Sequence, residues 1–464
     1  MRVGRRLGVL VVCVSTAVAG VGLGSGTGHA APRTVPNPTV EGPIGATGLW
    51  GHPWNDQFFE VGSIGYSEEE YFVAGTAKTY TATPTTAPYK TRVLVYRPTD
   101  PSRFNGTTIV EWDNVTAQDA EEPMWTWLHP MVFREGYAYV FVSAQAAAIC
   151  CGPRSHKVWD PVRYGSLTHP GDDYSFDIYS QVVQAVRSPV GIDPTGGLKT
   201  KRVLAVGNSQ SANRLHTYVD TVQPDAGVVD GFLLDAGGSK TYVREPLVPV
   251  IQLLSEDGLS PDSPNVSANY RLWEVPGASH NDADTGAHDA TSSRTATHAP
   301  KQPYAAEEEI HRNSHYGEEG LSAHATCSPV LVRGGNEYPR RYAVRAAVHH
   351  LDIWARTGTT APKPPRAQFD MLGLPRRDQH GNALGGLRLP PLDVPVASYP
   401  ATICGLFGAT VAFDPLTLAR LYPTHDDYVA KMQVATDRTV AAGFLLARDA
   451  DELMTLARAS SIGA

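Results

Sequence analysis

The chain has 464 residues, of which 42% are hydrophobic and 19% charged, an ordinary composition for a globular core. Its formal net charge of −8 at pH 7 argues against nucleic acid as a partner, because phosphate binding requires a basic face. The length could hold two domains, but large α/β enzymes often fill such a length with one domain and insertions.

The chain begins with a predicted secretory signal peptide, residues 1–30. Three arginines stand among the first six residues, an apolar run of small residues spans 7–23, and Gly28-His29-Ala30 fits a cleavage site. Cleavage after Ala30 removes those arginines and leaves a charge of −11. An uncleaved anchor is the alternative. No other segment has the ~18 apolar residues of a membrane span, so we expect a secreted or extracytoplasmic protein.

Four cysteines remain after cleavage: Cys150, Cys151, Cys327 and Cys404. An even number in an exported chain favours two disulfides, with free buried thiols as the alternative. Because neighbouring cysteines rarely pair, we expect Cys150 and Cys151 each to reach a distant partner.

The predicted elements follow a proline- and glycine-rich, irregular lead-in at residues 31–55. Strands are expected at residues 71–80, 91–96, 107–112, 137–143, 202–206, 228–234, 248–254 and 270–275. Helices are expected at 124–135, 174–187, 211–222, 340–356, about 414–421 and 425–446. Alternating strands and helices with tight connections predict the α/β class, a mostly parallel sheet with helices on both faces.

Two long polar stretches interrupt this pattern, at about residues 146–172 and 281–326. We interpret residues 31–464 as one domain that carries both as insertions. The second stretch contains His311 and His315, which could bind zinc from one helix face. The glutamate of a zinc-protease motif and nearby cysteine ligands are lacking, so a solvated loop or a rim over the active site is favoured. We expect no metal and no cofactor.

The segment Gly207-Asn208-Ser209-Gln210-Ser211 is the candidate nucleophile motif. A serine on a sharp turn between a strand and a helix stands clear of the backbone, and the crowded turn needs small residues two positions before and after it. Gly207 and Ser211 meet this requirement, although glycine is more usual at the second place. The alternative is an ordinary turn or a helix N-cap serine.

A histidine and an acid follow in the order that this chemistry requires. His280 comes directly after the last predicted strand and is the candidate general base. A strand runs into Glu256 and Asp257, of which Glu256 is our first choice for the acid and Asp257 the alternative. Asp235, after the preceding strand, is a third candidate.

The oxyanion hole needs two backbone N–H groups that point at the developing charge. One should belong to Gln210, the residue after the nucleophile. The other should come from the loop after residues 107–112, at Asn114 or Val115.

These residues resemble the α/β-hydrolase superfamily, and within it the exported bacterial "alpha/beta hydrolase domain-containing" family. The resemblance extends over most of the mature chain, and it rests on the following segments: Val110 to Thr116, Gly136 to Val140, Val142 to Gln145, Asp160 to Gly165, Gly207 to Ser211, Ser255-Glu256, Gly277 to His280 and Gly385 to Arg388. It implies a triad of Ser209, Glu256 and His280. The sequence departs from the pattern at Gln118-Asp119 and at Asp257-Gly258.

We therefore expect a secreted serine esterase that forms an acyl-enzyme intermediate with a small-molecule or lipid-like ester. An acyltransferase or a peptidase would use the same triad, and an inactive hydrolase fold would be a binding protein.

Overall fold

The computed structural model describes residues 35–464 except 239, 265, 287–294, 296–297 and 308–332. Within this part of the chain, nine strands form one sheet in the order β1-β2-β3-β5-β4-β6-β7-β8-β9. The six strands from β5 to β9 in that order pair in parallel, and β1, β2 and β3 add an antiparallel edge. This arrangement confirms the predicted α/β class.

The strands of the large sheet are β1 (Thr39–Glu41), β2 (Tyr66–Lys78), β3 (Thr86–Pro98), β4 (Thr107–Trp112), β5 (Ala138–Val142), β6 (Arg202–Asn208), β7 (Gly231–Asp235), β8 (Val250–Ser255) and β9 (Tyr270–Val275). A small second sheet contains β10 (Arg333–Gly334), β11 (Ala397–Ser398) and β12 (Ala409–Ala412). The longer helices are α1 (Pro123–Glu135), α4 (Ser175–Arg187), α5 (Gln210–Thr217), α10 (Arg341–Thr357), α12 (Pro415–Leu421), α13 (His425–Ala441) and α14 (Ala447–Ala459). Single helical turns are α2 (His156–Trp159), α3 (Pro161–Tyr164), α6 (Gln223–Ala226) and α11 (Pro390–Asp393).

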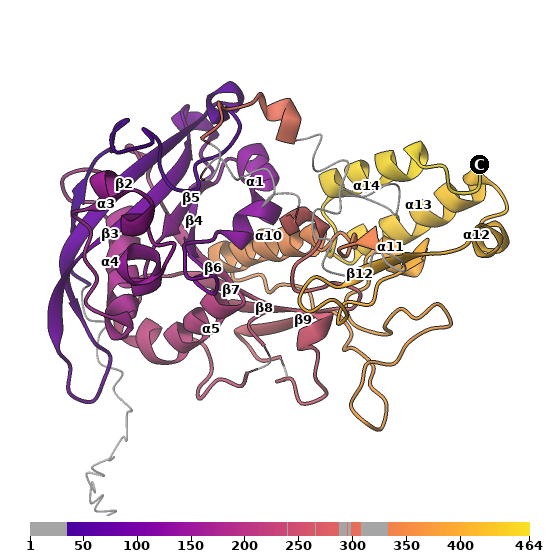
Figure 1. Ribbon diagram of the computed structural model, residues 1–464. Coiled ribbons are helices and arrows are strands. Elements are labelled where there is room, and N and C mark those ends of the chain that lie inside the picture. Colours follow the sequence, from indigo (N-terminus) through magenta and orange to yellow (C-terminus); the bar gives the residue numbers. More distant parts are fainter. Residues whose placement is uncertain (1–34, 239, 265, 287–294, 296–297, 308–332) are drawn as a thin grey trace, which may run out of the picture. The chain divides into compact units, whose positions relative to one another are not determined.

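Both faces of the sheet are buried, because successive residues of the central strands are apolar and side chains alternate between the faces. In β5, Tyr139 and Phe141 pack in the core with α1, α10 and the C-terminal helices α13 and α14. Val140 and Val142, on the other face, pack with α4 and α5. Figure 1 shows α10 and α4 on opposite sides of the strands.

Most predicted elements lie within a few residues of the observed ones, and β9 occupies the predicted residues 270–275. Three differences stand out. Strands β2 and β3 are thirteen residues each and extend beyond the predicted 71–80 and 91–96. The stretch 146–172 contains the turns α2 and α3. Helix α14 follows α13 as a separate helix that the sequence interpretation missed.

The prediction that Cys150 and Cys151 pair with distant partners is wrong. These neighbours form a disulfide with each other, at the end of a helical turn that spans Ala147–Cys151. Cys404 is disulfide-bonded as well, while Cys327 lies outside the described residues. The turn brings the two sulfur atoms together locally, so no long-range partner is needed.

Candidate functional site

Ser209 stands on a strained turn between β6 and α5. Its backbone angles are φ 56° and ψ −113°, a conformation that residues other than glycine seldom adopt. Its N–H donates to the main-chain oxygen of Asp235 at 2.8 Å, which ties the turn to the end of β7. The serine therefore lies at the carboxyl edge of the parallel strands, where ligands of α/β proteins bind.

Small residues surround this turn because α5 folds back closely on β6. A Cβ atom on Gly207 would lie 3.0 Å from the main-chain carbon and from Oγ of Ser211. The hydroxyl of Ser211 donates to the carbonyl oxygen of Asn208 at 2.9 Å and accepts from its N–H at 3.0 Å. Serine thus closes the turn with hydrogen bonds that glycine could not make, a role that the motif alone did not reveal.

His280 follows β9 and contacts Asp257, our alternative choice of acid. The Nδ1 atom of His280 lies 3.2 Å from Oδ2 of Asp257. The other carboxylate oxygen of Asp257 accepts from the hydroxyl of Ser255. Burial raises the pKa of Asp257, but the hydrogen bonds from His280 and Ser255 outweigh it and hold the pKa below its usual value. The carboxylate is therefore ionised at neutral pH and can orient the imidazole.

Glu256, our first choice of acid, does not contact His280. Its Oε2 accepts from the N–H of Gly277 at 2.7 Å, and its Oε1 lies 2.5 Å from Nη2 of Arg377. Both oxygens of Glu256 are thus engaged, whereas the carboxylate of the next residue, Asp257, contacts His280. The choice of Glu256 is corrected accordingly: this buried carboxylate joins β8 to the turn after β9.

Asp235, the third candidate acid, is also directed away from the imidazole. Its fully buried carboxylate accepts from Nδ2 of Asn208 at 2.6 Å and pairs with Arg340, which directly precedes α10. Asp235 therefore joins the serine turn to the start of that helix.

The expected oxyanion donors are the backbone N–H groups of Gln210 and of Asn114 or Val115. Gln210 is the first residue of α5, a position where a backbone N–H has no acceptor within its helix. The N–H of Asn114 donates to the carbonyl oxygen of Glu121 at 2.8 Å and is engaged. The N–H of Val115 faces Oε1 of Gln210 at 3.4 Å, so Val115 rather than Asn114 is the second candidate.

A cavity of about 780 Å³ opens beside Ser209 and His280. This volume is typical of small-molecule sites. Its aromatic wall consists of Trp54, Trp125, Trp159 and Phe407, and its polar side chains include Asn55, Gln57, Asp119, Glu122, Thr126 and Arg154. The polar loop after residue 280 also contributes, through Asn281, Thr285 and Thr295.

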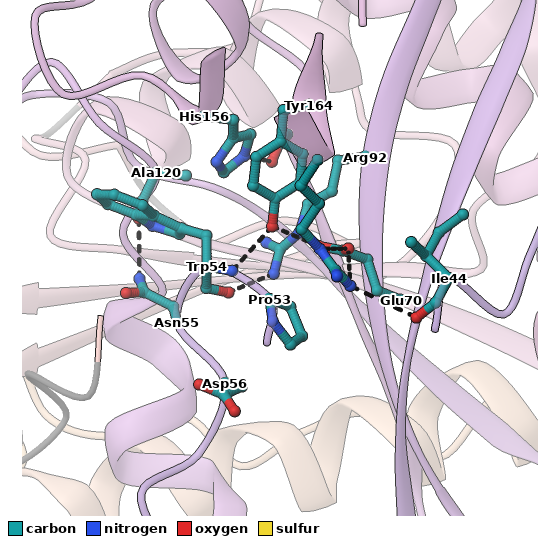
Figure 2. A network of polar contacts seen from close by, with 12 residues as sticks. Ile44, Pro53, Trp54, Asn55, Asp56, Glu70, Arg92, Ala120, His156 and Tyr164 are labelled. Atoms are coloured by element: carbon teal, nitrogen blue, oxygen red, sulfur yellow. Dashed lines mark hydrogen bonds and ion pairs between the residues drawn. The ribbon is translucent and has the colours of Figure 1, made fainter. Parts of the chain in front are cut away.

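Trp54 holds its place in this wall through buried charges behind it (Figure 2). Its N–H donates to the hydroxyl of Tyr164 at 2.8 Å, and its carbonyl oxygen accepts from Arg92. Glu70 in turn accepts from the same hydroxyl at 2.8 Å, pairs with Arg92 at 2.8 Å and pairs with Arg163 at 2.6 Å. This network (Glu70, Arg92, Arg163 and Tyr164) fixes one side of the cavity before any ligand binds.

His311 and His315, the alternative metal ligands, lie outside the described residues. In the part of the chain that the structure describes, no three histidine, cysteine, aspartate or glutamate side chains gather as a metal site would require. The predicted signal peptide also lies outside that part. No described helix has both the length and the apolar character needed to cross a membrane.

A family model with the description "Alpha/beta hydrolase domain" matches residues 40–455 of the chain. The match includes the serine turn, the turn after β8, the turn after β9 and every wall residue of the cavity. A search of curated proteins finds no match.

Solved structures that match this chain include the esterase Est22, with 12% identity, a TM-score of 0.28 and coverage of 42% of this chain. The aligned part of the chain spans 65% of that esterase. Est1E from Butyrivibrio proteoclasticus has 10% identity, a TM-score of 0.28 and coverage of 48% of this chain and 98% of its own. An alpha-beta serine hydrolase homologue from Coxiella burnetii has 11% identity, a TM-score of 0.27 and coverage of 41% and 84%. At these identities and TM-scores the structures support no conclusion about this chain.

Proposed function

Because the chain belongs to the alpha/beta hydrolase domain family, we propose that it is an exported serine hydrolase that cleaves a carboxylic ester through Ser209, His280 and Asp257. The observation that carries the proposal is the contact of 3.2 Å between His280 and Asp257 beside the cavity that Ser209 also lines. The expected export signal supports the localisation, and the cavity volume supports a small-molecule or lipid-like ester.

The proposed reaction begins with attack of the Ser209 hydroxyl on the ester carbonyl. Nε2 of His280 takes the hydroxyl proton, while Asp257 holds the Nδ1–H tautomer and stabilises the imidazolium. The N–H groups of Gln210 and Val115 stabilise the oxyanion. The alcohol leaves with the proton from His280, and water, activated by the same imidazole, releases the acid from the acyl-enzyme.

The Ser209 hydroxyl makes no side-chain hydrogen bond to any residue in the described part of the chain. Catalytic hydrogen bonds often tighten only when substrate binds, so this geometry is compatible with the mechanism. The side chain of Gln210, which lies against the N–H of Val115, must yield to the substrate oxygen for the second oxyanion donor to act.

The proposal is tested with a fluorophosphonate probe and p-nitrophenyl acetate. We expect one label per chain and release of p-nitrophenol, both abolished by Ser209→Ala. Ser102→Ala, an exposed serine in a surface turn, is the control and should retain both signals. Labelling of Ser209→Ala at the wild-type rate would refute the mechanism. Transfer of the acetyl group to an added alcohol, in preference to water, would identify an acyltransferase instead.

A further inference from the structure

Arg340 connects the histidine turn to the serine turn. Its Nη1 donates to two consecutive main-chain oxygens, of Ser279 at 3.0 Å and of His280 at 2.7 Å. Its Nη2 pairs with the carboxylate of Asp235. The guanidinium is fully buried and stacks over the ring of Trp127, 4.6 Å from the ring centroid.

Asp235 completes the connection on the nucleophile side. Its main-chain oxygen accepts the N–H of Ser209 at 2.8 Å, and its carboxylate accepts from Nδ2 of Asn208 at 2.6 Å. One residue therefore contacts the backbone of the proposed nucleophile and, through Arg340, the backbone of the proposed base. Because Ser209 and His280 follow different strands, β6 and β9, this polar path links two turns that are distant along the chain.

We propose that Arg340 and Asp235 are positioning residues that set the distance between Ser209 and His280. This inference rests on the proposed function. Burial of a charged pair contributes little net stability, since desolvation offsets the attraction, so stability alone is a weak reason to place both side chains here. A planar guanidinium with donors fixed in one plane, in contrast, holds two adjacent carbonyl oxygens and one carboxylate in a single geometry.

The matched control for Arg340 is Arg345, about one turn further along the same segment. Arg345 is also buried, pairs with Asp449 at 3.2 Å and donates to the main-chain oxygen of Trp127, but contacts neither turn of the site. Arg340→Met and Arg345→Met each remove one buried guanidinium at the start of α10. A purely structural role predicts the same outcome for both variants.

The kinetic test measures kcat and KM for p-nitrophenyl acetate per active site, with the active sites counted by fluorophosphonate. A shift of the base by about 1 Å costs roughly 100-fold in rate, so we expect kcat of Arg340→Met to fall by about that factor with little change in KM. Arg340→Lys, which keeps the charge but has a single donor nitrogen, should restore part of kcat. Equal kcat per active site in Arg340→Met and Arg345→Met would overturn the inference.

Hydrogen–deuterium exchange of the peptide that contains residues 277–281 gives a readout that needs no turnover. We expect faster exchange in Arg340→Met and Asp235→Asn than in Arg345→Met, compared at equal margins below each melting temperature. Unchanged exchange in both would overturn the inference, even if Arg340→Met were too unstable for kinetics. Failure of the wild-type protein to react with the fluorophosphonate would instead refute the proposed function, a result that the exchange experiment does not depend on.

Discussion

Replacement of Asp257, whose carboxylate contacts the imidazole of His280, should lower kcat without a matching loss of stability. Asp257→Asn keeps the shape of the side chain but can present an N–H to Nδ1 of His280, which favours the wrong tautomer. In serine hydrolases with this arrangement the change costs about 10⁴-fold in kcat. Here the contact is 3.2 Å long and the carboxylate is 26% exposed, so solvent can replace part of its effect. We therefore expect a loss of about 10²–10⁴-fold, or roughly 3–5 kcal/mol in the activation free energy.

Glu256→Gln is the matched control, since it changes the adjacent carboxylate in the same way. The new amide oxygen can still accept from the N–H of Gly277, and the lost ion pair involves Arg377, whose side chain is 34% exposed. We expect kcat within about threefold of wild type and a loss of about 1 kcal/mol in unfolding free energy. The assay is p-nitrophenyl acetate turnover per fluorophosphonate-reactive site, with urea unfolding in parallel. A larger loss of kcat in Glu256→Gln than in Asp257→Asn would refute our assignment of the acid.

Three further outcomes are expected. Ser211→Ala should cost about 1 kcal/mol of unfolding free energy by urea titration, since it removes the hydrogen bonds to Asn208, and no loss would contradict that role. Glu70→Gln should cost about 3–5 kcal/mol, because two buried arginines lose their shared anion; a melting temperature equal to that of wild type would exclude this. Burial, assisted by the charge of Asp284, raises the pKa of Asp282 to about 7. The folded protein therefore retains a proton that the unfolded chain loses above about pH 4, and stability declines as pH rises from about 4 to 7. Asp282→Asn should remove this part of the decline, and identical pH dependence in the two proteins would argue against it.

The positions of Ser209 and His280 in the fold could be predicted from the sequence because they depend on local patterns. Apolar runs that end in a turn predicted β6, β8 and β9, and the positions after them predicted that Ser209 and His280 would lie at one edge of the sheet. The C-terminal helix α14 was missed although its buried residues Ala450, Leu453, Met454 and Ala457 follow helical spacing. This spacing is visible in the sequence and predicts a helix over these residues.

The carboxylate that contacts His280 could not be predicted in the same way. Glu256 and Asp257 are neighbours after one strand, and the partner of Glu256 is Arg377, which lies 121 residues away in the sequence. The pairing of Cys150 with Cys151 was likewise missed. The prediction relied on the rarity of disulfides between neighbouring cysteines, whereas the pairing depends on the geometry of the local turn. Helices and strands could thus be predicted from the sequence, whereas long-range contacts and the geometry of single turns could not.

The irregular lead-in has a consequence for how this protein can be altered. Trp54, Asn55 and Gln57 precede β2, which begins at Tyr66, and lie more than 150 positions before Ser209 in the chain, yet they line the same cavity as Ser209. One part of the cavity wall is therefore encoded far from Ser209 and His280 in the gene. A trimmed N-terminus that begins after residue 57 would remove this part of the cavity wall, whereas exchange of residues 49–57 would change the wall without altering Ser209, Asp257 or His280.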